Sequence, residues 1–190
     1  MLKNKKAQTI GQVFIYIMAI IIFAAILIFG YKAISEFIDR GESVGFITFK
    51  TDLEKSVKTI YSDYGSVTIY NVENPLRVPG KYEEICFVDL SKPLPSSGSF
   101  CANHPIACDA WGTAYQAGIS SGTDGWQEGE QNVFLRPLGE IAIKVYKITV
   151  DSNSNNVDDD SDGYLCFNLT QGRLNMRIEG KGDHAFISAI

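Results

Sequence analysis

An uncharged stretch near the N-terminus constrains this chain more than any other feature. From Ala7 to Tyr31 there are 25 consecutive residues without a charged side chain, and residues 13–30 are apolar apart from Tyr16 and a glycine. Because a helix rises about 1.5 Å per residue, a stretch of this length reaches across a hydrocarbon core of about 30 Å. The stretch therefore predicts a membrane-spanning helix.

A secretory signal peptide is the alternative reading of the same stretch. Signal peptides have an apolar core of about 7 to 15 residues followed by a cleavage site of small residues. Here the apolar run is longer, and residues 30–34 (Gly-Tyr-Lys-Ala-Ile) make a poor cleavage site. Lys3, Lys5 and Lys6 precede the helix, whereas the charges after it nearly balance. The positive-inside rule therefore places the N-terminus in the cytoplasm and residues 32 onward outside, at the cell surface.

The charge distribution argues against a nucleic-acid-binding protein. The formal net charge of the 190-residue chain is −5, but residues 1–30 carry +3, and residues 65–190, with nine basic and sixteen acidic side chains, carry −7. An acidic surface is repelled by a duplex, and no stretch combines basic residues with stacking aromatics. We therefore expect the membrane, and not nucleic acid, as a partner.

The residues at the start of the helix carry a family resemblance. The tetrapeptide Lys5-Lys6-Ala7-Gln8, followed within a few residues by the apolar stretch, resembles the class III signal peptide of archaeal type IV pilin-like proteins. The resemblance implies that a prepilin peptidase cuts between Ala7 and Gln8. Loss of the three lysines would change the net charge from −5 to −8.

On this reading residues 1–7 are a cleaved basic leader and residues 8–30 are a transmembrane and assembly helix through which copies associate. The chain departs from the family pattern at the fifth mature position, where Gln12 stands in place of a glutamate. In pilins that glutamate pairs with a neighbour's new N-terminal amine. The alternative to a filament subunit is a plain single-span anchor that carries an extracytoplasmic binding module.

A second helical pattern follows the apolar stretch. Apolar residues recur every three or four positions, at Phe46, Phe49, Leu53, Val57, Ile60 and Tyr64. This spacing predicts an amphipathic helix over residues 31–64. With residues 8–30 it forms one long helix, or two in line if the chain breaks around Gly41 and Gly45, and Gly65 ends it. The apolar stripe packs either on the protein's own sheet or on helices of neighbouring subunits.

Beyond residue 65 the apolar period becomes two, which is typical of strands. The predicted strands are 66–72, 84–90, 132–135, 141–150, 164–169, 173–179 and 185–188. Turn signals at 171–172 and 180–183 predict that the last three strands form an antiparallel meander. The predicted fold class is α+β, with a long N-terminal membrane and amphipathic helix followed by an antiparallel β-sheet head at residues 65–190. A long helix lying on an antiparallel sheet is also what the pilin resemblance implies.

Residues 91–131 interrupt the strand pattern with 41 residues that include six Gly, six Ser and three Pro. This insertion is too long for an ordinary loop. Residues 105–117 can form a short helix that places Trp111 and Tyr115 together. With Trp126 and Phe100 they form either an exposed aromatic contact surface or a cap on one edge of the sheet core.

The four cysteines all follow the membrane helix, on the oxidising side. An even number there predicts two disulfides, with three possible pairings. We favour Cys101 with Cys108, which flank a short loop, and Cys86 with Cys166, which lie in similar strand contexts. The alternative is a metal site at Cys101, His104 and Cys108, although a structural zinc requires a fourth ligand.

An acidic segment indicates a possible structural calcium. Asp158, Asp160 and Asp162 alternate before a glycine, as in the first half of a calcium loop, and the backbone carbonyl of Tyr164 is the next ligand in that pattern. Position twelve is Leu169 and not an acid, so the segment is no EF-hand. The alternative is a solvated acidic loop, and no other cofactor is indicated.

Two further motifs are short: an N-glycosylation sequon and a G-x-S-x-G pattern. Asn168 begins the one N-glycosylation sequon of the chain, and its position outside the membrane makes it usable. Residues 118–122 match G-x-S-x-G, but a nucleophile elbow requires a strand before it and a helix after it. The sequence therefore indicates no enzyme.

Overall fold

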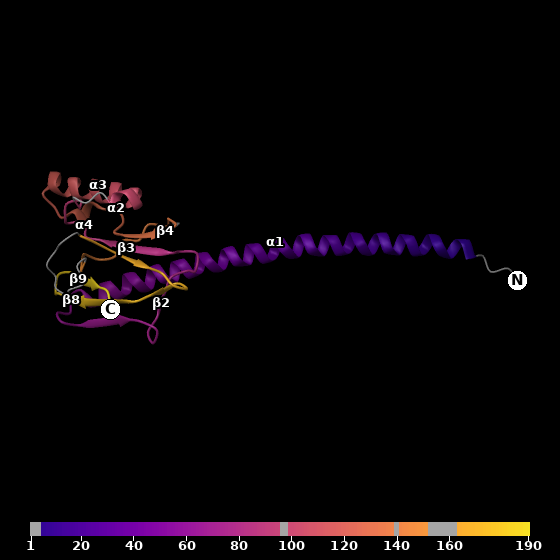
Figure 1. Cartoon of the computed structure of the whole chain (residues 1–190), viewed down its shortest axis with the longest axis horizontal. Coiled ribbons are helices and arrows are strands. Elements are labelled where there is room, and N and C mark those ends of the chain that lie inside the picture. The colour runs from indigo at the N-terminus through magenta and orange to yellow at the C-terminus, as the bar shows by residue number, and fades with distance from the viewer. Residues whose placement is uncertain (1–4, 96–98, 139–140, 152–162) are drawn as a thin grey trace. The chain divides into compact units, whose positions relative to one another are not determined.

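Figure 1 shows the computed structural model of the chain, which describes residues 5–95, 99–138, 141–151 and 163–190. The chain divides into two compact units, Met1–Val44 and Gly45–Ile190. A single helix, α1 (Lys5–Ile60), belongs to both and continues without interruption through Gly41 and Gly45. The long N-terminal helix and the β-rich domain that follows it confirm the predicted α+β class.

In the first unit the large apolar side chains of α1 from Val13 onward are exposed. Ile20 and Phe29, for example, are 67% and 72% exposed. The helix is long and apolar enough to cross a membrane, judged by its length and composition. Such a surface requires a cover of lipid or of other helices, because apolar area in water is unfavourable.

In the second unit the apolar stripe of α1 is buried. Its members are each 4% exposed or less: Phe46, Phe49, Leu53, Val57 and Ile60. They share one hydrophobic core with strand residues such as Ile85 and Ile178. Within the chain itself, therefore, the stripe packs on the protein's own sheets.

The prediction that this stripe includes Tyr64 is wrong. The helix ends at Ile60, and Tyr64 is 81% exposed. The chain reverses at Gly65, which has a left-handed φ of 81° and donates its amide to the carbonyl of Gly180. A Cβ on Gly180 would lie 2.0 Å from the carbonyl oxygen of Ile60, so glycine permits this close approach. The helix ends early because the chain must turn here into the first strand.

Within the described residues the strands form three sheets, in which every strand pair but one is antiparallel. The first has the order β1 (Val67–Tyr70), β8 (Met176–Gly180), β9 (Ala185–Ser188), β5 (Ile148–Val150), and β5 runs parallel to β9. The second has the order β4 (Val133–Arg136), β3 (Glu84–Val88), β6 (Tyr164–Asn168). The third pairs β2 (Leu76–Arg77) with β7 (Arg173–Leu174). The parallel pair is a departure from the predicted all-antiparallel head.

The last three predicted strands do not form the three-stranded meander that the sequence predicted, although part of it is present. The turn forms, with positive φ at both Gln171 and Gly172, and Thr170 bridges Arg173 across it. The strands on either side then diverge, because β6 pairs with β3 and β7 pairs with β2. Only the final hairpin, β8 with β9, is as predicted.

The predicted strand at 141–150 is shorter than expected, since only β5 at its end is a strand. Ahead of it, the buried Asn132 side chain takes the place of a partner strand. Its Oδ1 accepts from the amide of Val145 at 2.8 Å, and its Nδ2 donates to the carbonyl of Val145 at 3.3 Å. Because the Asn132 side chain satisfies the backbone amide and carbonyl of Val145, no strand pairing is required at that residue.

The sheet of β4, β3 and β6 is buried on both faces. Along β3, Ile85 and Phe87 belong to the core shared with α1, whereas Cys86 and Val88 belong to a second core. The second core is closed by the insertion, which forms α2 (Ser99–Asn103), α3 (Pro105–Ser121) and α4 (Gly125–Glu128). These helices lie on the opposite side of β3 from α1 (Figure 1). The predicted short helix at 105–117 therefore exists and is longer than expected.

Candidate functional site

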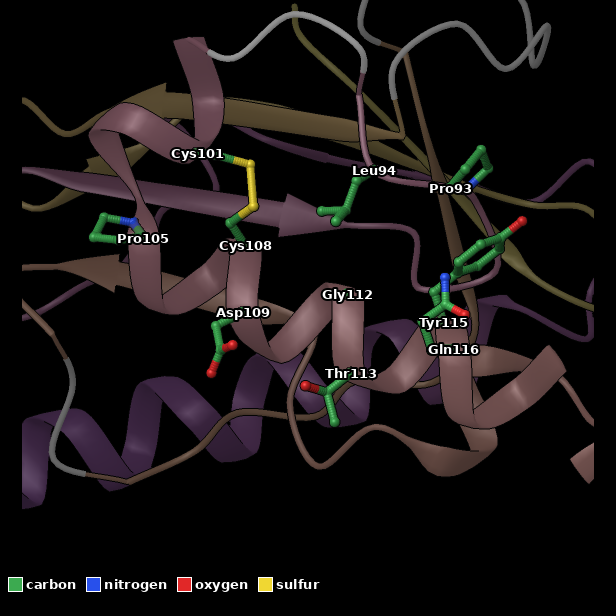
Figure 2. A pocket seen from close by; sticks show the side chains of 10 residues that line it. All are labelled: Pro93, Leu94, Cys101, Pro105, Cys108, Asp109, Gly112, Thr113, Tyr115 and Gln116. Atoms are coloured by element: carbon green, nitrogen blue, oxygen red, sulfur yellow. A yellow bond between two sulfur atoms is a disulfide. The ribbon is translucent and has the colours of Figure 1, made fainter. Parts of the chain in front are cut away.

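A groove lies beside α3. Its volume is about 820 Å³. The lining residues are Pro93, Leu94, Cys101, Pro105, Cys108, Asp109, Gly112, Thr113, Tyr115 and Gln116. Figure 2 shows the Cys101–Cys108 disulfide at one end, Tyr115 and Pro93 at the other, and Leu94 between them. The lining combines apolar side chains and the Tyr115 ring with the polar side chains of Asp109, Thr113 and Gln116, a composition that occurs in ligand-binding surfaces.

Trp111 does not contribute to that surface, so the exposed contact surface predicted there is wrong at this residue. Its side chain is 0% exposed, and its indole Nε1 donates to the carbonyl of Lys92 at 2.8 Å. Phe100 and Tyr164 contact it edge-on, with ring centroids at 5.9 and 6.5 Å. Trp111 and Phe100 thus follow the alternative reading, in which they close a core against the sheet.

The other two predicted contact aromatics lie apart. Tyr115 is half-buried and lines the groove on α3. Trp126, in α4, is half-buried as well, and its Nε1 donates to the carbonyl of Val145 at 2.9 Å. It lies in an aromatic cluster with Tyr146, which stacks on Tyr61 at a centroid distance of 3.8 Å. The insertion therefore leaves Tyr115 as the one predicted aromatic on the groove.

Both disulfides are formed, in the pairings that the sequence favoured. Cys86 on β3 is bonded to Cys166 on β6, and these two residues are direct partners in the strand register. Cys101 is bonded to Cys108 and joins α2 to α3. Because Cys101 and Cys108 are bonded to each other, the metal alternative built on them does not apply to this oxidised chain.

His104 lies beside the other disulfide. Its Nε2 is 3.8 Å from Sγ of Cys86 and 3.5 Å from Oε2 of Glu84. Arg136, the strand partner of Glu84, places its Nε 3.2 Å from the same carboxylate oxygen. Glu84 and Arg136 were not predicted from the sequence. They meet His104 only through the pairing of β3 with β4 and the position of the α2–α3 junction, and these segments lie far apart along the chain.

A second polar cluster ties the insertion to the sheet. Asp124 caps α4 by accepting from the amide of Trp126, and its carboxylate also accepts from Nζ of Lys147 and from the hydroxyl of Ser91. Burial would raise the pKa of Asp124, but the hydrogen bonds from Lys147, Ser91 and Trp126 hold it below its ordinary value. The pKa of Lys147 is raised in turn, chiefly by its bond to Asp124.

Nearby Asp89 behaves in the opposite way, because burial raises its pKa above the ordinary value. Its carboxylate accepts from the amide of Ser91 at 3.0 Å.

The cap at Asp124 was detectable in the sequence, since an aspartate three residues before Gln127 matches a capping signature. The hydrogen bonds and ion pair of Asp89 and Asp124 hold the insertion against the sheet.

The remaining predicted residues belong to the calcium, glycosylation and G-x-S-x-G motifs. Asp158, Asp160 and Asp162 lie outside the described residues, and Tyr164 is the first residue of β6, so calcium binding stays a prediction. Asn168 is exposed at the end of β6, where a glycan can be accommodated. Ser120 of the G-x-S-x-G motif lies in α3 and donates to the carbonyl of Gln116, which is not the geometry of a nucleophile elbow.

Taken together, the fold is that of an α+β protein with one long apolar N-terminal helix and a disulfide-bonded, β-rich domain, a pilin-like architecture. The helix and the disulfides are features of a membrane-anchored protein whose cysteine-bearing domain lies outside the reducing cytoplasm. Comparison with family models, with curated proteins and with solved structures gives no match for this chain.

Proposed function

We propose that this chain is a structural subunit of a type IV pilus-like surface filament, with no catalytic role. A prepilin peptidase removes residues 1–7, the helix from Gln8 onward anchors the subunit in the membrane, and the same helix later packs against copies of itself. The heads then coat the filament and make its adhesive contacts.

The apolar surface of α1 in the first unit carries this proposal. Its exposed residues do not form a single stripe, because consecutive large side chains from Val13 to Ile17 are 50% exposed or more. A helix that is apolar on all sides needs a cover around its whole circumference, in lipid or in a bundle of like helices. The stripe from Phe46 to Ile60, by contrast, is already covered within its own unit.

The processing step gives the sharpest test. The full-length chain is produced in membranes with and without an archaeal prepilin peptidase, and the intact mass of the purified protein is measured. We expect a chain that begins at Gln8 only when the peptidase is present. The double variant Lys5→Gln/Lys6→Gln should stay uncleaved, because it removes the basic pair that precedes the cut.

Lys3→Gln is the matched control, since it removes one leader charge outside the tetrapeptide and should be cleaved normally. Failure of the peptidase to shorten the wild-type chain would remove the main support for the proposal. Equal cleavage of the wild type and of the double variant would show that the tetrapeptide is not the recognised signal.

A monomeric, anchored binding module is the second candidate, and the groove beside α3 favours it. A head that binds a ligand there needs no assembly, so the chain would keep residues 1–7 and remain a single species in the membrane. The two candidates therefore differ in the mature N-terminus and in whether copies of the chain associate.

A further inference from the structure

Four potential metal ligands converge on one face of β3. This cluster does not depend on whether the chain polymerises. Glu84 and Cys86 are two positions apart on the strand and so point to the same side. Cys166 is opposite Cys86 on β6, and His104 approaches from the junction of α2 and α3. The four ligand atoms all lie within 4.8 Å of one another.

The spacing of these atoms resembles that of a tetrahedral zinc site. Zinc bonds of about 2.0–2.3 Å imply ligand-to-ligand distances of about 3.3–3.8 Å. Nε2 of His104 is already 3.5 Å from Oε2 of Glu84 and 3.8 Å from Sγ of Cys86. The two sulfurs are closer only because a covalent bond joins them.

The carboxylate of Glu84 gives a second observation that points to a cation. Its Oε2 is buried and accepts no hydrogen bond within the described part of the chain, although Nε of Arg136 lies 3.2 Å away. The side chains of Glu84 and His104 are each 13% exposed. The ion pair with Arg136 offsets part of the cost of burying this oxygen, and a metal ion bound to it would satisfy the oxygen directly.

We propose that Glu84, Cys86, His104 and Cys166 form a zinc site when the Cys86–Cys166 disulfide is reduced. Two sulfurs, one imidazole nitrogen and one carboxylate oxygen are a ligand set that suits four-coordinate zinc. The same pair of cysteines thus alternates between a disulfide in the oxidised head and a metal thiolate in the reduced one.

A dithiol reductant gives two electrons and two protons to the Cys86–Cys166 bond and itself becomes a disulfide. Zinc then replaces the two thiol protons, which are released to solvent. A disulfide-bearing oxidant reverses the process: it takes two electrons from the two thiolates and two protons from solvent and becomes a dithiol, while the Cys86–Cys166 bond re-forms and the zinc ion leaves.

Cobalt provides the spectroscopic probe for this site. The full chain in detergent is reduced without oxygen, freed of reductant and titrated with Co²⁺, which shows thiolate charge-transfer bands and tetrahedral ligand-field bands when it occupies such a site. We expect one cobalt ion per reduced chain, displacement of cobalt by Zn²⁺, and no such bands from the oxidised chain.

Two matched double variants show which pair of cysteines binds the metal. Cys101→Ser/Cys108→Ser keeps the proposed ligands and should bind cobalt like the wild type, whereas Cys86→Ser/Cys166→Ser should lose the bands. Glu84→Gln keeps every cysteine and the oxidised fold, so it reports on the site even if a cysteine variant fails to fold. Its affinity should fall by about tenfold or more.

Three results would overturn the proposal. One is the absence of cobalt binding by the reduced wild type. Another is a Glu84→Gln variant that binds as tightly as the wild type. The third is binding that survives in Cys86→Ser/Cys166→Ser and disappears in Cys101→Ser/Cys108→Ser, which would assign the metal to the helical cysteines instead.

Discussion

For single residues, burial decides the role of the aromatic side chains in the insertion. Trp111 and Tyr115 are one helical turn apart, yet the first is enclosed under Phe100 and Tyr164 whereas the second faces the groove. Their spacing shows that they share a side of α3 but not which of them the sheet covers, because the cover comes from β3 and β6. The sequence therefore predicted that both residues lie on one side of α3, but not that Trp111 is buried while Tyr115 lines the groove.

Replacement of Trp111 should reduce stability and not merely binding. Trp111→Ala empties a core position and should cost about 3–5 kcal/mol, whereas Trp111→Phe leaves the Lys92 carbonyl without its donor and should cost about 1–3 kcal/mol. Tyr115→Phe, on the groove, should change the free energy of unfolding by less than about 0.5 kcal/mol. Denaturant unfolding followed by circular dichroism measures all three. Unchanged stability in Trp111→Phe would contradict the core assignment.

The Asp124 cluster gives a prediction with a pH dependence. The folded-state pKa of Asp124 lies below its ordinary value of 3.8. Its stabilising contribution is therefore fully present above that ordinary value and is lost as the pH falls through the lower, folded-state value.

Asp124→Asn should consequently cost about 1 kcal/mol at neutral pH, since the pair with Lys147 is partly exposed and screened. The stability difference between Asp124→Asn and the wild type should narrow below pH 3.8. Because Asp89 is present in both proteins, its opposite pH dependence largely cancels in that difference. A stability difference that is independent of pH would contradict this account, because each hydrogen bond that lowers the pKa of Asp124 stabilises its charged form.

Among the elements, the local ones were predictable and the non-local pairings were not. Apolar periodicity located α1 and strands such as β3, and the turn at Gln171 and Gly172 formed as its residues require. How the strands on either side of the turn pair depends on partners far along the chain, since β6, before the turn, pairs with a strand about 80 residues earlier and β7, after it, pairs with β2. Periodicity carries no information about such a partner. The cysteines did carry it, because the bond between Cys86 and Cys166 joins β3 directly to β6.

The two disulfides should contribute unequally to stability. Their cysteines are separated by 80 and 7 residues, and the chain-entropy account assigns about 4.5 kcal/mol to the longer loop and about 2.5 kcal/mol to the shorter one. Cys86→Ser/Cys166→Ser should thus destabilise the oxidised head more than Cys101→Ser/Cys108→Ser does. Denaturant midpoints of the two double variants give the comparison, and the reverse order would refute the loop-length explanation.

At the scale of the whole molecule, the chain combines parts with opposite surface requirements. The boundary between its compact units falls between Val44 and Gly45, within the segment predicted as the amphipathic helix, because the buried stripe from Phe46 onward packs with the sheets. Before that boundary the helix exposes apolar side chains, and beyond residue 65 the chain carries a charge of −7. A membrane or filament core suits the first part, and water outside the cell suits the second.

The most direct test of the filament proposal is peptide mass spectrometry of filaments sheared from cells that make this chain. We predict that the chain is recovered in the sheared fraction and that its N-terminal peptide begins at Gln8. A chain that stays in the membrane fraction, with residues 1–7 still attached, would contradict the proposal.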